Sequence, residues 1–233
     1  MQGVKKIDAA ALKRPLVVAT AHSAAGLRIA TGLGPRDVDL VEVRVDALLG
    51  QLGLLRRLLP TLKVPILLTV RHPAEGGLGG LTLFRRKELF AEFLHQAALV
   101  DVELRSVKAF GKIIAAAKAG GTVVVVSDHH FAATPSFRSM CAREHRAFSA
   151  GADVFKIATA TDDLRSFARL LEFSGRAARG LRAVMGMGKF GQVSRLSLAR
   201  AGSVLNYGYL DKPNAPGQWE ARELKSLFAR MGI

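Results

Sequence analysis

The sequence predicts an α/β fold, a (β/α)8 TIM barrel that spans residues 1–233 as one domain. Three observations lead to this prediction. Eight short apolar runs recur, helical periodicity fills several of the intervals between them, and 233 residues shared among eight units leave about 29 residues each, near the compact end for this fold. The runs begin near Leu16, Leu40, Val64, Leu99, Thr122, Asp153, Leu181 and Ser203.

Most of these runs have the composition of buried parallel strands, because they are rich in Val, Ile or Leu and too short for buried helices. Between them, apolar residues follow helical spacing from Leu83 to Ala98, with Arg85 and Arg86 on the opposite, solvated face. Thr134-Pro135 and Thr161–Asp163 carry residue types that begin helices. A doubly wound open sheet is the alternative, but it usually needs fewer strands, and no linker or composition shift divides the chain.

The composition excludes several classes of protein. Apolar residues make up 49% and charged residues 23%, an ordinary globular balance. The longest run without charge holds only the residues between Arg14 and Arg28, fewer than the roughly 18 that a membrane-spanning helix needs. The apolar run Leu16–Ala21 is short for the hydrophobic core of a signal peptide. The single cysteine, Cys141, cannot by itself form an internal disulfide or a cysteine-ligated zinc site. These features predict a cytoplasmic protein that does not enter a membrane.

The charge balance is strongly basic. Lys and Arg number 34 against 19 Asp and Glu, a net charge of +15 that attracts anions of any kind. Nucleic-acid binders usually concentrate such charge in a tail or patch interleaved with aromatic residues, whereas here it is scattered and only 6% of residues are aromatic. The pattern does not favour nucleic-acid binding.

Charged side chains alternate with apolar ones in two of the predicted strands. The second strand continues as Glu42-Val43-Arg44-Val45-Asp46, and the fourth as Asp101-Val102-Glu103-Leu104-Arg105. A solvent-facing edge strand would explain one such stripe. Two stripes in a sheet covered on both faces instead predict buried charges that pair inside the barrel.

Other polar residues stand at the ends of predicted strands, where barrel enzymes place their catalytic groups. The third strand ends at Arg71 and leads through Glu75 into the glycine-rich loop Gly76–Gly80. The fifth ends at His129 and His130, whose side chains point to opposite faces, so at most one faces the barrel centre. That imidazole could act as a general base near neutral pH, while a helix cap or a surface residue is the alternative for either histidine.

Three further features lie in the second half of the chain. Lys156 is flanked by apolar residues in the sixth strand, where it is either a lysine that forms a Schiff base with a ketone or one that snorkels to the strand end. Gly186–Gly191 formally matches the dinucleotide fingerprint but does not lie in a first βα turn. Arg195 could clamp a carboxylate or lie on the surface, and Gln218 follows a Pro- and Gly-containing loop.

Taken together, these residues resemble the type I 3-dehydroquinate dehydratases, Schiff-base lyases of the shikimate pathway, from about Leu16 to Trp219. The resemblance implies a (β/α)8 barrel, usually dimeric, that uses no metal or cofactor and removes water from 3-dehydroquinate to give 3-dehydroshikimate. The matching pieces are Glu42–Asp46, Thr69–Arg71, Glu75–Gly77, Val102–Leu104, Ser127–His129, Val154–Ala158, Met187–Lys189, Ser194–Leu196 and Ala215–Gln218.

The resemblance also implies a role for each matching side chain. Lys156 would form the Schiff base with the C3 ketone of the substrate. His129 would remove the C2 proton and then protonate the departing C1 hydroxyl, while Glu75 orients His129. Arg195 would bind the substrate carboxylate. The remaining binding positions would contact ring hydroxyls or close the loop, and they are Glu42, Arg44, Arg71, Asn214 and Gln218.

Two positions depart from the family pattern. His130 stands where the family commonly has Asp, and Asn214 stands where it commonly has Ser. We expect activity to survive, because Asn can still hydrogen-bond and the lysine, the base and the arginine are intact. Two alternatives stay open: another Schiff-base barrel, such as an aldolase, which would share Lys156 but not need the other groups, and an inactive barrel with a basic binding surface.

Overall fold

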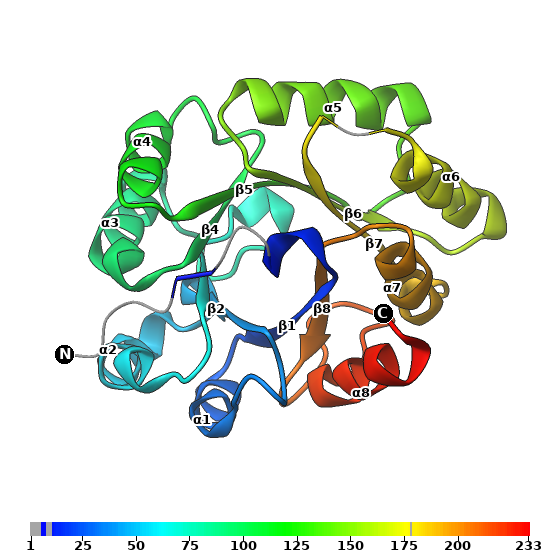
Figure 1. Cartoon of the computed structure of the whole chain (residues 1–233). Helices are drawn as coiled ribbons and strands as arrows, with labels where there is room; N and C mark the ends of the chain where they lie inside the picture. Colours follow the sequence, from blue (N-terminus) through cyan, green and yellow to red (C-terminus); the bar gives the residue numbers. More distant parts are fainter. Residues whose placement is uncertain (1–5, 8–10, 178) are drawn as a thin grey trace.

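The computed structural model describes residues 6–7, 11–177 and 179–233. The described residues form eight parallel strands that curve into a nearly closed barrel with helices around its outside (Figure 1), which confirms the predicted (β/α)8 fold. Each expected apolar run contains a strand. The strands are β1 (Leu16–Ala21), β2 (Leu40–Arg44), β3 (Ile66–Thr69), β4 (Leu99–Glu103), β5 (Val123–His130), β6 (Val154–Ala160), β7 (Leu181–Met187) and β8 (Leu205–Tyr209).

The strands pair in the order β7-β6-β5-β4-β3-β2-β1-β8, so that each strand lies beside its neighbour in sequence and β1 also pairs with β8. An isolated parallel bridge between Arg182 and Ser203 joins β7 to the segment before β8 and brings the two ends of the sheet together. Because all the strands run the same way, their carboxyl ends gather at one mouth of the barrel. This is the end at which polar residues follow the strands.

Helices connect the strands on the outside of the barrel. They are α1 (Ala24–Gly32), α2 (Leu52–Leu58), α3 (Leu83–Phe93), α4 (Gly111–Ala119), α5 (Phe137–Ser149), α6 (Leu164–Gly175), α7 (Gly191–Arg200) and α8 (Ala221–Met231). Short 3-10 helices add η1 (Ala11–Lys13), η2 (Val45–Ala47), η3 (Leu49–Gln51), η4 (Leu59–Thr61), η5 (Pro73–Glu75) and η6 (Leu94–Gln96).

Helix boundaries differ in places from the sequence prediction. The helix expected to run to Ala98 ends at Phe93, because the chain tightens into η6 before the residue pair Ala97-Ala98 enters β4. Helix α5 begins at Phe137. The Ser136 side chain caps it by accepting a hydrogen bond from the backbone nitrogen of Ser139, so Pro135 precedes the helix rather than starting it. Asp163 caps α6 as its sequence position predicted.

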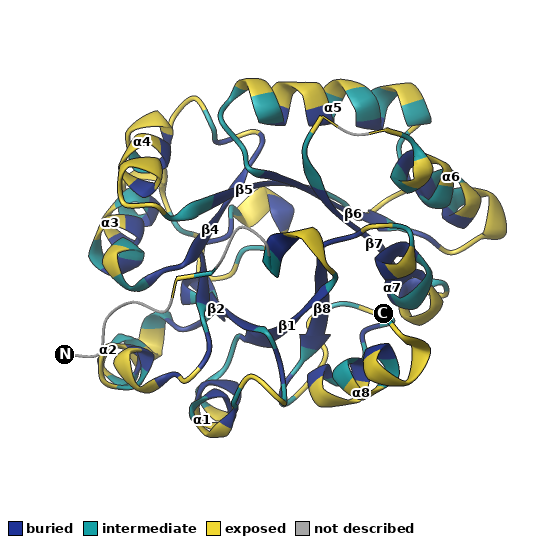
Figure 2. Ribbon diagram, viewed as in Figure 1, coloured by how far each residue is buried: buried dark blue, intermediate teal, exposed yellow. Residues whose placement is uncertain are grey.

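The core has two layers of side chains, one on each face of the strands. Figure 2 shows that the strands are coloured mostly as buried. The larger layer lies between the strands and the helices and includes Val41, Val43 and Phe155. The smaller layer fills the barrel interior near the start of the strands and contains Leu16, Leu40 and other residues from most of the strands. Alternation along each strand therefore sends one set of side chains outward to the helices and the other inward.

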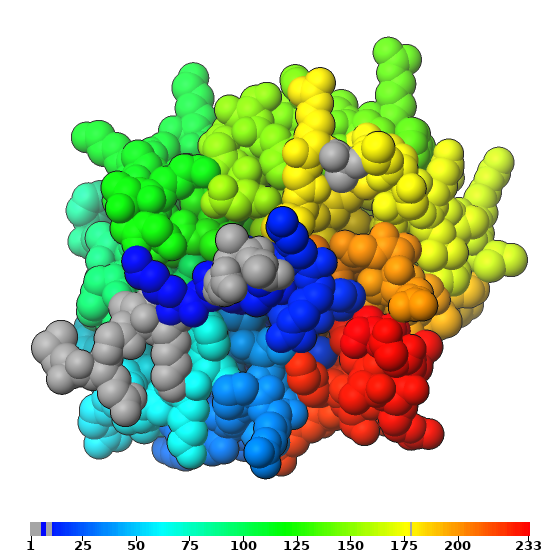
Figure 3. Space-filling view, viewed as in Figure 1, coloured from blue at the N-terminus to red at the C-terminus, as the bar shows by residue number. Residues whose placement is uncertain are grey.

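Residues 11–15, which precede β1, cover the opening at the start of the strands. Leu12, in η1, is buried and packs against the inner layer of the core. Seen from this side, η1 lies over the middle of the barrel (Figures 1 and 3). The polar mouth at the other end is therefore the accessible end of the interior.

One predicted surface residue is instead buried. Arg86 was expected on the solvated face of α3, but it is only 1% exposed. Its guanidinium turns inward, donates to the Val70 carbonyl at 2.9 Å and pairs with Glu103. A buried carboxylate on the neighbouring strand attracts the arginine, and this attraction overrides the helical periodicity that assigned it to the surface.

Among the residues that the structure describes, no helix is both long enough and apolar enough to cross a bilayer.

Candidate active site

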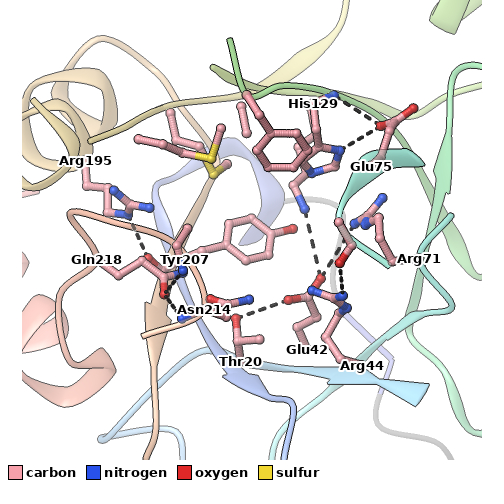
Figure 4. A pocket seen from close by; sticks show the side chains of 17 residues that line it. Thr20, Glu42, Arg44, Arg71, Glu75, His129, Arg195, Tyr207, Asn214 and Gln218 are labelled. Carbon is pink, nitrogen blue, oxygen red and sulfur yellow. Dashed lines mark hydrogen bonds and ion pairs between the residues drawn. The ribbon is translucent and has the colours of Figure 1, made fainter. Parts of the chain in front are cut away.

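A pocket opens at the carboxyl end of the barrel and collects every site residue that the sequence predicted (Figure 4). Its walls come from strands all round the barrel and from the loops that follow them. The lining residues are Thr20, Glu42, Arg44, Arg71, Glu75, Gly76, His129, Phe131, Lys156, Ala158, Met185, Met187, Arg195, Tyr207, Asn214, Ala215 and Gln218.

Lys156 lies on the inner face of β6, at the floor of this pocket. The side chain is almost fully buried, so it does not snorkel to solvent as one interpretation of the sequence allowed. Its Nζ donates to Asp101 at 2.9 Å and lies 4.0 Å from a Glu42 oxygen. The ring centroid of Tyr207 lies 4.0 Å from the same nitrogen. The amine is therefore held at the base of the pocket by charge on one side and an aromatic face on another.

Buried charges surround Lys156, as the two charged stripes predicted. Arg71 spans β3 to β5 and donates to Asp101 at 2.8 and 2.9 Å and to Glu103 at 3.2 Å. Glu42 accepts hydrogen bonds from Thr20 at 3.1 Å and from Thr69 at 2.9 Å. Every carboxylate oxygen of Glu42, Asp101 and Glu103 has at least one donor, which a buried charge cluster requires.

The pKa values of this cluster follow from its pairing. Burial by itself would raise the pKa of Asp101, but the charges of Arg71 and Lys156 outweigh it and hold that pKa well below its usual range. Burial would likewise lower the pKa of Arg71, yet the carboxylates of Asp101 and Glu103 raise it well above its usual value. Both groups are therefore charged at neutral pH.

His129 and Glu75 meet at the rim of the pocket. The Nδ1 atom of His129 lies 2.9 Å from a Glu75 oxygen, and the backbone nitrogen of the same histidine donates to that oxygen at 3.2 Å. This contact directs the other ring nitrogen, Nε2, away from Glu75. Of the two adjacent histidines, His129 lines the pocket, and His130 turns aside to Asp128 at 3.0 Å.

Burial controls the ionisation of this pair. It raises the pKa of Glu75 to about 7, in spite of the opposing charge of Arg71. It lowers the pKa of His129 well below its usual range, and the positive charges of Arg71 and Lys156 act in the same direction. At neutral pH the imidazole is therefore neutral, the form in which it can accept a proton.

Arg195 begins on α7 and extends into the pocket wall. It is 1% exposed, and its Nε and Nη1 atoms donate to four backbone carbonyls, those of Tyr207, Gly186, Gly191 and Gly217, at 2.7–3.1 Å. No carboxylate of the described residues pairs with it, and burial lowers its pKa to about 10. Its Nη2 makes no hydrogen bond to a described residue. A buried, unpaired cation that lines a pocket is a site for an anion.

The last loop of the pocket is held by Gln218. Its side-chain oxygen accepts from the backbone nitrogen of Asn214 at 2.9 Å and of Ala215 at 3.3 Å. Gln218 thus shapes the loop that carries Asn214 to the pocket wall. On the opposite wall, Arg44 pairs with Asp46 at 2.7 Å and donates to the Gly76 carbonyl at 3.0 Å, which ties β2 to the glycine-rich loop.

Three residues in or beside the pocket have no role assigned from the sequence: Thr20 and Tyr207, which line it, and Asp101, which contacts Lys156. Asp101 was recognised only as part of a charged stripe, and its contact with Lys156 depends on strands that are not adjacent in the barrel. Thr20 and Tyr207 stand in apolar runs, where nothing marked them as polar lining. The alternation of each strand would have placed them on the inner face, but it does not show which inner residues reach the mouth.

The comparisons with known proteins agree with this geometry. The family model described as Type I 3-dehydroquinase matches residues 15–233. The 3-dehydroquinate dehydratase of Methanocella arvoryzae is 35% identical over 220 residues, which cover 94% of this chain and 98% of that protein. The enzyme of the same name from Pyrococcus abyssi is 34% identical, covering 83% of this chain and 88% of that protein.

Solved structures show the same likeness. The type I 3-dehydroquinate dehydratase of Clostridium difficile, solved with covalently modified comenic acid, superposes with a TM-score of 0.84 at 26% identity, covering 94% of this chain and 92% of that one. The 3-dehydroquinate dehydratase of Aquifex aeolicus gives a TM-score of 0.79 at 28% identity, covering 92% and 98%. The chain belongs to the type I 3-dehydroquinase family.

Proposed function

We propose that the pocket dehydrates 3-dehydroquinate to 3-dehydroshikimate through a Schiff base on Lys156, the reaction of its family. The observation that carries this proposal is a buried lysine that shares one pocket with a neutral histidine and an unpaired arginine. These three groups supply an electrophile-forming amine, a base and an anion site, which the reaction needs together. An aldolase acting on a small oxo acid would need the lysine but not the other two.

The first step forms the covalent intermediate. The ammonium of Lys156 releases one proton, and the resulting neutral amine attacks the C3 carbonyl carbon. The carbonyl oxygen takes up that proton and one from the nitrogen and leaves as water, which gives an iminium cation between Nζ and C3. The carboxylate of Asp101, 2.9 Å from Nζ in the free protein, lies where it can stabilise this positive charge. The iminium draws electrons from the adjacent C2 and makes its proton acidic.

The second step is the elimination. His129 accepts the C2 proton at Nε2 while Glu75 holds Nδ1. The electron pair left at C2 expels the C1 hydroxyl, which leaves as water with the proton that His129 returns. Hydrolysis of the iminium by one water then releases 3-dehydroshikimate and restores Lys156. The net change is the loss of one water molecule.

The substrate is positioned by the remaining residues. The Nη2 atom of Arg195 binds the carboxylate, since its other donors are held by backbone carbonyls. Glu42, Arg44 and Arg71 face the ring hydroxyls. The loop shaped by Gln218 presents Asn214 to the same substrate.

We also propose that the whole chain is one catalytic domain, and that the enzyme works in the cytoplasm as a homodimer without a metal or cofactor.

Reductive trapping tests the central step. Purified protein is mixed with 3-dehydroquinate and borohydride, and the intact mass and the modified peptide are measured. We expect a reduced adduct on Lys156 and none in the Lys156→Ala variant, which should also lose nearly all turnover. Folded protein that turns over no substrate and forms no adduct would exclude this reaction and leave the alternative of an inactive barrel.

A further inference from the structure

The ring of Tyr207 lies against the reactive nitrogen of Lys156, in addition to the carboxylate of Asp101. It lies on the inner face of β8, is 3% exposed, and lines the pocket. Its ring centroid is 4.0 Å from the Nζ of Lys156, so the nitrogen sits over the aromatic face. Figure 4 shows the ring of Tyr207 in the middle of the site, between Arg195 on one side and Glu42 and Arg71 on the other.

The phenol hydroxyl does not explain why an aromatic residue stands here. It is buried and has no hydrogen-bond partner among the described residues. A buried hydroxyl without a partner costs free energy. Whatever Tyr207 contributes in the free protein therefore comes from its ring.

An aromatic face attracts cations, and the attraction grows where water is excluded. The nitrogen of Lys156 is cationic at two stages of the proposed reaction, as the ammonium that pairs with Asp101 and as the iminium bound to substrate. The iminium nitrogen has one hydrogen where the ammonium has three, so it can make fewer hydrogen bonds to the carboxylate. The ring face needs no hydrogen and can act on both forms.

We infer that Tyr207 is a positioning residue whose ring face holds the nitrogen of Lys156 and stabilises the iminium cation. The inference rests on the proposed function, because the iminium exists only if Lys156 forms the Schiff base. It predicts that a ring is required at this position and that the electron density of its face sets the rate. The phenol hydroxyl is not required.

A fluorination series separates this effect from simple packing. Position 207 is changed to Phe and then to phenylalanines with one, two and three ring fluorines, which keep the shape while removing electron density from the face. For each protein, kcat, KM and the fraction of Lys156 trapped by borohydride are measured at saturating 3-dehydroquinate. We expect Tyr207→Phe to stay within about threefold of the unmodified protein, and kcat to fall progressively to about a tenth of the Phe value with three fluorines.

Two further variants serve as controls. Tyr207→Leu removes the ring and should lower kcat and the trapped fraction at least as much as full fluorination. Phe155→Leu removes a buried ring from the same strand as Lys156, but on the outer face, and should lower thermal stability while leaving trapping unchanged.

The outcomes are distinguishable. A progressive fall in kcat with fluorination, together with near-normal activity of Tyr207→Phe, supports the inference. Equal activity across the fluorinated series in a protein that forms the adduct overturns it and leaves the proposed function standing. An unmodified protein that forms no adduct overturns both.

Discussion

At the scale of single residues, the site depends on charges that the protein has removed from water. Glu75 and His129 are both buried, and burial moves their pKa values in opposite directions, Glu75 to about 7 and His129 well below its usual range. Their contact at 2.9 Å is therefore formed between a neutral imidazole and a carboxyl group that ionises near physiological pH. The ionised form of Glu75 accepts a hydrogen bond from the Nδ1–H group of His129, which leaves Nε2 unprotonated and able to act as the base.

We expect the rate to follow the ionisation of Glu75. In the unmodified protein kcat should rise as the pH increases through about 7, because the carboxylate form holds His129 in the productive tautomer. The Glu75→Gln variant has no such ionisation, so it should lose this limb of the profile and have a lower kcat above pH 8. The measurement is kcat from pH 5.5 to 9. An unchanged limb in the variant would assign it to a different group.

The same substitution, Glu75→Gln, should lower kcat but raise the stability of the protein at high pH. A carboxyl pKa raised from 4.5 to about 7 means that Glu75 keeps a proton in the folded state that it has lost in the unfolded state, so the contribution of Glu75 to stability falls as the pH rises across that interval. Glu75→Gln removes this cost and should gain up to about 3 kcal/mol at pH 8 but little at pH 4. Urea unfolding at both pH values measures it, with exposed Glu172→Gln as the control that should show no such difference.

Arg195 allows a test of substrate binding. Arg195→Lys keeps the positive charge but loses the planar fork and its extra donor. We expect KM for 3-dehydroquinate to rise at least about tenfold, since a charge-assisted hydrogen bond contributes about 1.5–3 kcal/mol, while kcat stays within about threefold. Initial rates give both values, and Arg200→Lys, on the exposed end of α7, is the matched control. A fall in kcat with an unchanged KM would argue against the assigned role.

At the scale of elements, one close approach of the backbone positions Glu75. Gly77 follows η5, and a Cβ at this position would lie 2.2 Å from the Arg71 carbonyl oxygen and 2.7 Å from the His72 carbonyl carbon. Only glycine permits the chain to fold back so tightly after β3. This turn places the Glu75 carboxyl group in contact with His129 at the end of β5.

Gly77→Ala should therefore impair catalysis through the backbone. The added methyl group forces the turn away from Arg71 and moves Glu75, so we expect kcat to fall about tenfold or more and the melting temperature to drop by several degrees. Gly53→Ala in α2 is the matched control, because nothing lies within 4 Å of its added Cβ. That variant should keep full activity and gain slightly in stability. Normal kcat in Gly77→Ala would show that the turn tolerates displacement.

At the scale of the whole molecule, buried ion pairs join strands that are distant in the sequence. The salt bridges between Arg71 and Asp101 and between Lys156 and Asp101 connect β3, β4 and β6 across the barrel interior. Asp101 has a pKa well below normal, so its ionised form contributes stability above about pH 4 that is lost on acidification. His129, with its lowered pKa, adds a loss that begins below about 6.5.

Stability should therefore change little between pH 7 and 5 and fall below about pH 4. In the upper interval His129 binds a proton in the unfolded state but not in the folded state, and this loss opposes the gain from protonating Glu75, whereas at lower pH the protonation of Asp101 dominates. Urea unfolding from pH 7 to 3 checks this. Because buried pairs are screened only weakly, the acid-induced loss should persist in 0.5 M salt. A loss that disappears in salt would indicate repulsion among the surface charges instead.

The amino-acid sequence by itself determined the positions of the strands and the two charged stripes that point into the barrel, while the resemblance to a known family supplied the predicted site residues. Runs of Val, Ile and Leu placed all eight strands, and the charged stripes around Glu42 and Asp101 correctly indicated a polar interior. These properties are local, because they depend on the alternation of neighbouring side chains along one strand. The periodicity of a single helix, which is also a local property, predicted Arg86 on the surface, and this prediction is wrong because Arg86 is buried.

Only the tertiary structure decided which inner residues meet. The contacts of Lys156 with Asp101 and Tyr207 join strands that are not adjacent in the sheet order, and Arg86 is drawn inward by Glu103. Periodicity gives the face on which a side chain lies but not the distance across the barrel. That distance is set by how the sheet closes, and in a water-poor interior it decides which charges pair and which pKa values shift.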